Sequence, residues 1–273
     1  MRYRLFLCSE EDIASVNIRD ALLRSAEWED DGKFLYHGDT AMMSIPNIHI
    51  RAENVDDMAK KKGIDASEVI FLSRHSAASK IPTLTVHPIG NFHDAEFGGR
   101  PRTLVRSSAM TMTELLRNMM SKDTKQFKVS FEVTHHGPFV SIPATFIEIG
   151  SDAAQWNNKD ASKVIADSLL KIDDNDYINA IGIGGGHYAP RFTEMAQKYK
   201  VNIGHMMPEY AFKDSDDDDL VRMMKEAADR SSTNIAYIHK RSMNAATAKR
   251  VLNAATSCGL ETISSDDLDV IGN

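Results

Sequence analysis

The stretch that decides the fold is INAIGIGGGHYAPRFTEMAQKYKVNIGHM, residues 178–206. Residues 178–183 form a short apolar run typical of a buried strand, and 201–206 form a second one. Between them, residues 191–199 have helical spacing, and Pro190 stands where a first helical turn would begin. A strand, a helix and a strand in this order predict two parallel strands joined by a crossover helix.

The same alternation extends outward in both directions. Downstream we expect helices at 216–229 and 243–257 and strands at 234–239 and 260–264. Upstream we expect helices at 10–26, 55–62, 109–120 and 158–171, and strands at 3–8, 69–72, 83–86, 128–133 and 145–149. The pattern predicts one α/β domain over residues 1–273, with a small strand-rich excursion around 34–52 and a long loop at 88–106. The expected architecture is a three-layer α/β/α fold with a mixed, mainly parallel sheet.

Composition excludes several classes of protein. A chain of 273 residues with 42% hydrophobic and 26% charged residues is neither disordered nor a small disulfide scaffold. Two distant cysteines, no apolar stretch of about 20 residues and no secretory leader favour the cytoplasm. The net charge of −7 argues against a nucleic-acid partner, but Asp214 and 216–219 carry five of those charges. We expect this run to begin a helix; a calcium site is the less favoured alternative because EF-hand spacing is absent.

Six of the ten histidines follow apolar strand-like runs. They are His75, His87, His135, His136, His187 and His205. Ligands in open α/β folds bind beyond strand ends, so several histidines there predict a shared catalytic or metal site. Successive strand side chains alternate between faces, so His135 and His136 would not normally both enter it, unless the Gly-Pro turn that follows relaxes the rule. Glu148, between two isoleucines, is either a ligand or base, or faces solvent.

The glycine run 182–186 is a candidate substrate-facing turn, and a plain tight turn is the alternative. It matches neither the dinucleotide fingerprint nor a Walker A loop. The basic residues are clustered and form either a solvated face or a positive rim that binds phosphate. They are Arg74, Arg100, Arg102, Arg106, Lys122, Lys125, Lys128, Arg191 and the run His239-Lys240-Arg241.

Five motifs stand in the order found in one known family. They are LSRH at 72–75, LTVHPIGNF at 84–92, THHGP at 134–138, FIEIGS at 146–151 and GIGGGHYAP at 182–190. Together they make the chain resemble the archaeal and plant type of D-aminoacyl-tRNA deacylase along nearly its whole length. The resemblance implies hydrolysis of the ester between a D-amino acid and tRNA, in chiral proofreading that includes aldehyde-modified substrates. It also implies zinc, and a fold related to phosphorylases, zinc exopeptidases and peptidyl-tRNA hydrolases.

The resemblance suggests roles for individual residues. Zinc would be held by some of His75, His135, His136, Glu148 and His187, and would activate water. The expected catalytic residues are His136, Glu148, His187 and Asn91, with His136 or Glu148 as the base and Asn91 orienting the aminoacyl group. The amides of Gly184, Gly185 and Gly186 would hold the oxyanion or a phosphate. The expected contacts to the acceptor stem are Arg74, Arg100, Arg102 and Lys125.

Two other functions remain open from the sequence alone. One is a peptidyl-tRNA hydrolase-like or zinc-peptidase-like hydrolase on the same fold. The other is a non-catalytic tRNA-binding module, which the histidine cluster disfavours because phosphate binding needs Lys and Arg more than His. We expect a monomer, with a weak homodimer as the alternative.

Overall fold

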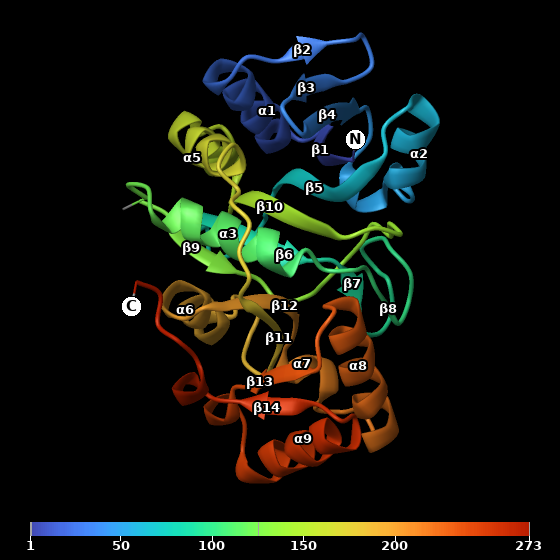
Figure 1. Cartoon of the computed structure of the whole chain (residues 1–273), viewed down its shortest axis with the longest axis vertical. Helices are drawn as coiled ribbons and strands as arrows, with labels where there is room; N and C mark the ends of the chain where they lie inside the picture. The colour runs from blue at the N-terminus through green and yellow to red at the C-terminus, as the bar shows by residue number, and fades with distance from the viewer. Residues whose placement is uncertain (1, 125, 273) are drawn as a thin grey trace.

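The computed structural model describes residues 2–124 and 126–272 and contains a large mixed sheet in its upper half (Figure 1). Eight strands follow the spatial order β2-β3-β4-β1-β5-β10-β6-β9. Their bounds are β1 Tyr3–Ser9, β2 Glu29–Asp30, β3 Leu35–His37, β4 Thr40–Ile45, β5 Ala66–Arg74, β6 Thr83–Pro88, β9 Lys128–Phe131 and β10 Ala144–Gly150. From β4 to β10 neighbouring strands are parallel, whereas β6 is antiparallel to β10 and parallel to β9.

A second, smaller sheet occupies the lower half of Figure 1. It consists of β11 Ile178–Ile183, β12 Val201–Met207, β13 Ile235–Ile238 and β14 Glu261–Ile263, in the order β12-β11-β13-β14. All three strand pairs are parallel, as the alternation after residue 151 predicts. The predicted mixed, mainly parallel α/β fold is therefore confirmed, but its strands divide between these two sheets and one two-stranded ribbon.

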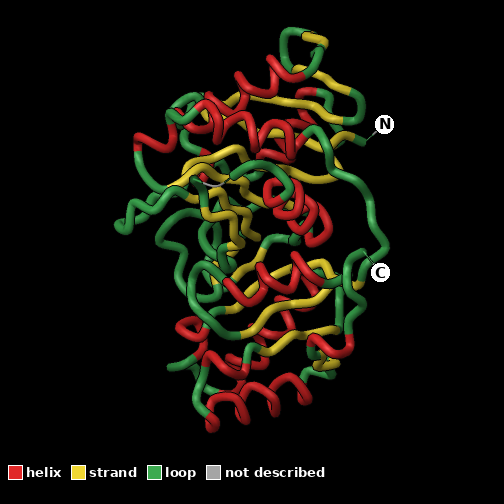
Figure 2. Tube along the Cα trace, turned by 90° about the vertical axis from the view of Figure 1, so that its left-hand side faces the viewer, coloured by secondary structure: helices red, strands yellow, loops and turns green. Residues whose placement is uncertain are grey.

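Helices cover both faces of the sheets, as Figure 2 shows in a view turned by 90°. Their bounds are α1 Ile13–Ser25, α2 Val55–Lys62, α3 Ala109–Met120, α4 Ala153–Trp156, α5 Lys159–Leu169, α6 Pro190–Lys198, α7 Glu209–Phe212, α8 Asp217–Arg230 and α9 Ala245–Ser257. Short 3-10 helices span His49–Arg51, Lys240–Ser242 and Ser265–Asp267. Helices α3 and α6 contact β12 of the second sheet and also β9 of the first, so they lie between the sheets.

The core explains why the two sheets pack together. In β1, Phe6 belongs to one apolar core while Leu5 and Leu7 belong to another, as strand alternation requires. The core that contains Phe6 continues through Met112 of α3 and Phe192 of α6 into β12. Helices α8 and α9 close a third core on the far side of the second sheet. The two sheets therefore share one buried helical layer.

Several predicted element ends match the structure. Helix α2 ends where expected because Gly63 adopts φ 113°, a left-handed conformation suited to glycine. Asp216 caps α8 by accepting a hydrogen bond from the Asp219 amide at 2.7 Å, so the acidic run begins a helix as predicted. The predicted 88–106 loop contains a short antiparallel ribbon, β7 Gly90–Asn91 with β8 Thr103–Leu104. Within the described residues, no helix is both long and apolar enough to cross a membrane.

Candidate active site and metal centre

A buried cluster of histidines and carboxylates lies where the first sheet meets the second. His75 follows β5, His87 lies in β6, Glu148 lies in β10, and His187 occupies the turn between β11 and α6. Since β6 runs antiparallel to β10, these side chains do not meet at a shared carboxyl edge. They meet because Thr85 pairs with Glu148 and His87 pairs with Phe146 across the two strands.

Glu132 is the carboxylate around which three of the histidines gather. It directly follows β9 and is fully buried. Its Oε2 lies 2.8 Å from Nε2 of His187 and 3.6 Å from Nε2 of His135, and its Oε1 lies 3.2 Å from Nδ1 of His75. Burial alone would raise the pKa of Glu132, but the hydrogen bond from His187 and electrostatic interaction with the nearby imidazoles of His135 and His75 hold it well below its usual range. Glu132 is therefore ionised in the folded protein.

Glu148 is the second buried carboxylate of the cluster. Its Oε2 lies 3.6 Å from Nε2 of His87 and 3.7 Å from Nδ1 of His75. Burial lowers the pKa of His87, but the nearby carboxylates of Glu148 and Glu132 outweigh burial and raise it. The flanking isoleucines pack into the core on the other face, so Glu148 faces this site and not solvent.

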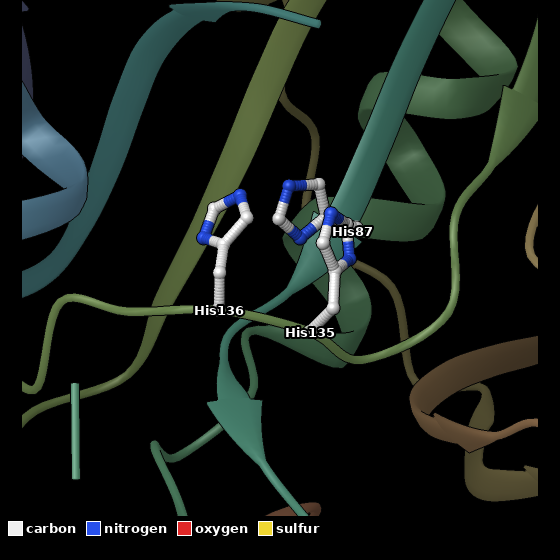
Figure 3. Close-up of side chains that lie close together, drawn as sticks. All are labelled: His87, His135 and His136. Atoms are coloured by element: carbon white, nitrogen blue, oxygen red, sulfur yellow. The ribbon is translucent and has the colours of Figure 1, made fainter. Parts of the chain in front are cut away.

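His87, His135 and His136 form a compact trio, and their rings point into the same space (Figure 3). The ring centroids are 4.1 Å apart for His87 and His135, 4.4 Å for His135 and His136, and 4.8 Å for His87 and His136. His136 has φ 43°, a left-handed conformation that breaks strand alternation. Both rings of the His135-His136 pair therefore enter the site, which a regular strand would not allow.

Each ring of this trio has one nitrogen held by the backbone. The Nδ1 atoms of His87, His135 and His136 lie 3.0, 2.8 and 2.6 Å from the carbonyl oxygens of Pro88, Val133 and Gly137. A carbonyl oxygen only accepts, so each Nδ1 carries a proton, and whenever a ring is neutral its Nε2 offers the lone pair. Burial lowers the pKa of His135 and of His136 well below the ordinary value, with the neighbouring rings adding to the effect. Neutral imidazoles with an oriented Nε2 are the form that binds metals.

Comparison with known proteins then defines the family. A family model described as D-aminoacyl-tRNA deacylase matches residues 62–263, about three quarters of the sequence. The chain belongs to the D-aminoacyl-tRNA deacylase family. The resemblance inferred from the five motifs is thereby confirmed.

Individual relatives of the deacylase family support the assignment along the whole chain. The D-aminoacyl-tRNA deacylase of Archaeoglobus fulgidus is 36% identical over 272 residues, covering 96% of each chain. That of Methanosarcina mazei is 32% identical and covers 96% of this chain and 92% of its own. A solved crystal structure of a conserved protein of unknown function superposes with a TM-score of 0.88 at 33% identity, over 99% of both chains.

The buried cluster contains two groups of residues that could hold a metal ion. They are His87 with His135 and His136, and His75 with Glu132 and His187; within each group the candidate ligand atoms lie within 4.8 Å of one another. Two buried atoms support a fit to a cation, because Nε2 of His87 and Oε1 of Glu132 have no hydrogen-bond partner. The three free Nε2 atoms of the trio match the three-histidine set of catalytic zinc sites.

The structure brings together all five residues that sequence analysis named as metal ligands, namely His75, His135, His136, Glu148 and His187. Glu132 and His87 also belong to the cluster, although neither is among the five expected ligands. Glu132 stands between Phe131 and Val133, as Glu148 stands between two isoleucines, so the same pattern could have identified it. His205 does not join the cluster, because its ring nitrogens contact Val105 and Thr134 instead.

The glycine turn differs from its expected role. The Gly184 amide donates to the Met207 carbonyl, and the Gly185 amide donates to Oγ of Ser242, both at 2.8 Å. Those two amides are therefore used within the protein and do not hold an oxyanion, which leaves Gly186 as the remaining candidate of the three.

Asn91 lies beside the cluster, in the wall of a pocket of about 360 Å³ that also contains His135 and His136. Its Nδ2 donates to the carbonyls of Gly98 and Arg100, which leaves only its carbonyl oxygen for a substrate amine. The pocket is large enough for an aminoacyl group, and Phe92 and Phe97 contribute apolar surface to it.

Of the four basic residues expected to bind tRNA, the three that the structure describes each have different neighbours. The Arg74 guanidinium lies over Trp156, and that of Arg100 lies 3.6 Å from the ring centre of Phe139. Arg102 is paired with Asp219 and lines a pocket that also contains Asp214, Asp216 and Asp218, surroundings that disfavour a phosphate. Lys125 lies outside the described residues.

Proposed function

We propose that this chain hydrolyses the ester bond between a D-amino acid and the terminal ribose of tRNA, including aldehyde-modified D-aminoacyl-tRNA, and so acts in chiral proofreading. The observation that carries the proposal is the buried His and Glu cluster beside the 360 Å³ pocket, in a chain of the deacylase family. The family match does not favour the peptidyl-tRNA hydrolase, peptidase or binding-module alternatives. The cytoplasmic location and the monomeric state stay predictions.

The cofactor we propose is zinc, held by the Nε2 atoms of His87, His135 and His136. Bound there, zinc would polarise the ester carbonyl and acidify a water molecule. The Pro88 carbonyl, which accepts from Nδ1, would keep the His87 ring in place, and the Glu148 carboxylate, 3.6 Å from Nε2, would put a negative charge beside the ion. In this assignment His136 binds the zinc ion and Glu148 acts beside His87. Neither residue is the base.

We assign the base to His187. Its Nε2 donates to Glu132 at 2.8 Å, so Nδ1 carries the lone pair and faces the Tyr210 hydroxyl at 3.4 Å. The His187 side chain is 36% exposed, whereas Glu132 is completely buried. A buried carboxylate that orients a partly exposed imidazole is a general base arrangement, in which His187 accepts a proton from water and returns it to the ribose oxygen.

The experiment that tests the function compares three substrates. Purified protein is incubated with D-Tyr-tRNA, L-Tyr-tRNA and N-acyl-L-aminoacyl-tRNA, with and without a chelator. We expect release of the D-amino acid only, loss of release in the chelator, and recovery on adding zinc. Equal release of the L-amino acid, or release only of the N-acylated form, contradicts the proposed function. Chelator-insensitive release contradicts the zinc assignment alone.

A matched pair of variants tests the metal site. His135→Ala is expected to lose both bound zinc, measured by elemental analysis, and turnover. His37→Ala removes an exposed histidine of β3 that contacts the Glu27 carbonyl and the Trp28 ring and belongs to neither candidate metal group, so this variant is expected to retain both. A His135→Ala protein with a full complement of zinc would show that the trio does not hold the metal.

A further inference from the structure

The second sheet contains a topological switch point between β11 and β13. The chain leaves β11 through α6 toward β12, then returns across the sheet through α8 to β13. Helix α6 packs toward the first sheet through Phe192, whereas α8 packs on the opposite face with α9. The loops after β11 and β13 therefore diverge to opposite faces. In parallel α/β sheets, ligands bind beyond the carboxyl ends of the strands at such a point.

The two diverging loops are held together by direct hydrogen bonds. The His239 amide donates to the Ile183 carbonyl at 2.8 Å, and Oγ of Ser242 accepts from the Gly185 amide at 2.8 Å. Gly184 makes this approach possible, since it has φ 102° and a Cβ there would lie 2.7 Å from Cε of Met243. These hydrogen bonds fix the two loops at the edge of the second sheet. One of the loops is the turn that carries His187.

A pocket of about 660 Å³ at this edge is lined by basic side chains. They are Arg191, His239, Lys240 and Arg241, and we call this set the basic pocket. Lys240 and Arg241 are exposed, and neither side chain has an ion-pair or hydrogen-bond partner among the described residues. The one carboxylate in the pocket lining, Glu194, already binds both Arg191 and Lys198 at 2.8 Å. Unlike the pocket around Arg102, the basic pocket has an excess of positive charge.

We propose that the basic pocket binds backbone phosphates of the RNA whose 3′-terminal ester lies at His187. The proposal rests on the proposed function and adds the surface that receives the substrate. Arg191 follows His187 by four residues, and the turn 184–187 joins the pocket to the catalytic cluster. The pocket therefore begins three residues after His187, at Pro190. Guanidinium and ammonium groups without carboxylate partners are the groups that bind phosphates.

The test measures binding of deacylated tRNA to the intact protein by fluorescence anisotropy over a range of salt concentrations. The variant is the double substitution Lys240→Gln and Arg241→Gln, which contacts neither the cluster nor the sheet-to-sheet core. The matched control is Lys60→Gln with Lys61→Gln, two exposed lysines of α2 in the other half of the molecule. We expect the first variant to raise Kd ~10-fold at low salt and to reduce the slope of log K against log salt by about 1.4, the value for two contacts to single-stranded RNA. The control is expected to match the wild type.

Three results would overturn the proposal. The first is an unchanged Kd and salt slope in the Lys240 and Arg241 variant, and the second is an equal loss in the control. The third is that 5′-AMP or inorganic phosphate binds as tightly as tRNA and the variant affects only that binding, which would indicate a small-phosphate site. Because tRNA binding requires no turnover, failure here is distinguishable from failure of the proposed hydrolysis. If D-Tyr-tRNA is hydrolysed, the variant should raise KM and leave kcat within about twofold.

Discussion

Glu132 contacts histidines from three separate segments of the chain. It binds His187 directly and lies within 3.6 Å of His75 and His135. Its carboxylate fixes which nitrogen of His187 faces the substrate, and it offers a negative charge beside the candidate metal ligands. This residue therefore couples the proposed base to the proposed metal site.

Glu132→Gln keeps the size of the side chain and removes its charge. We expect kcat/KM for D-aminoacyl-tRNA to fall about 10- to 100-fold, the range for groups that orient metal ligands or bases. Thermal unfolding should still show a folded protein, since the Gln oxygen can accept from His187. The control is Glu261→Gln in β14, where the side chain is exposed. Wild-type turnover in Glu132→Gln would show that Glu132 has only a packing role.

His205 gives a separate prediction about pH and stability. Burial lowers the pKa of His205 to about 4 from 6.5, although the hydrogen bond to the Val105 carbonyl opposes the shift. The folded state keeps this imidazole neutral, so its contribution to the free energy of unfolding is fully present above pH 6.5. It is lost as the unfolded chain takes up a proton between pH 6.5 and 4.

We expect His205 to account for a loss of about 2 kcal/mol in the free energy of unfolding between pH 7.5 and 5. Denaturant unfolding of wild type and His205→Gln at both pH values measures this, because the variant lacks the titrating group. The difference in stability between the two proteins should shrink by that amount at pH 5. An equal difference at both pH values would contradict the prediction.

At the level of elements, local sequence patterns predict helices well. Residues 109–120 and 55–62 are helical with the predicted bounds, because apolar spacing and Gly63 act locally. The pairing of strands was not predicted. Strand pairing depends on contacts between residues that are distant in sequence. The antiparallel pairing of β6 with β10 is one example. The division into two sheets follows from the same long-range contacts.

The candidate site was predicted only in part, because local patterns show some of its residues and long-range contacts determine the others. Histidines that follow apolar runs are visible in sequence, so His75, His135, His136 and His187 were identified. Glu132 resembles a residue inside a strand, and only its contacts show that it is the centre of the cluster. The left-handed conformation of His136 likewise depends on the fold around it. The expected amide donors at Gly184 and Gly185 were wrong because Met207 and Ser242 take those hydrogen bonds.

The acidic start of α8 gives a prediction at the scale of an element. Asp216→Ala removes the side chain that accepts from the Asp219 amide, so the free energy of unfolding should fall by about 1 kcal/mol. Asp214→Ala is the control, since its side chain is 87% exposed and lies outside the helix. We expect the control to change stability by less than about 0.5 kcal/mol. Equal effects of the two substitutions would mean that net charge, and not the cap, determines the change.

At the scale of the whole molecule, metal binding should stabilise the fold. A ligand present at 100 times its Kd adds about 2.7 kcal/mol to the free energy of unfolding, and for a chain of this length that raises Tm by about 5 °C. Zinc-loaded and chelator-treated wild type should differ by about this amount in calorimetry. His135→Ala should show no difference between the two treatments. A zinc-dependent shift that survives in this variant would place the metal elsewhere.

The hydrogen bond between Glu132 and His187 joins residues on either side of an exposed connection. Asp173 and Asp174 lie in the segment between α5 and β11, where the chain passes from the first sheet to the second (Figure 1). A break between these two aspartates would put Glu132 on one fragment and His187, the proposed base, on the other. Neither fragment alone should release an amino acid, and mixing them should restore hydrolysis only if the halves reassociate. The enzyme is thus a natural starting point for a split reporter, in which recovered deacylation measures the association of two pieces.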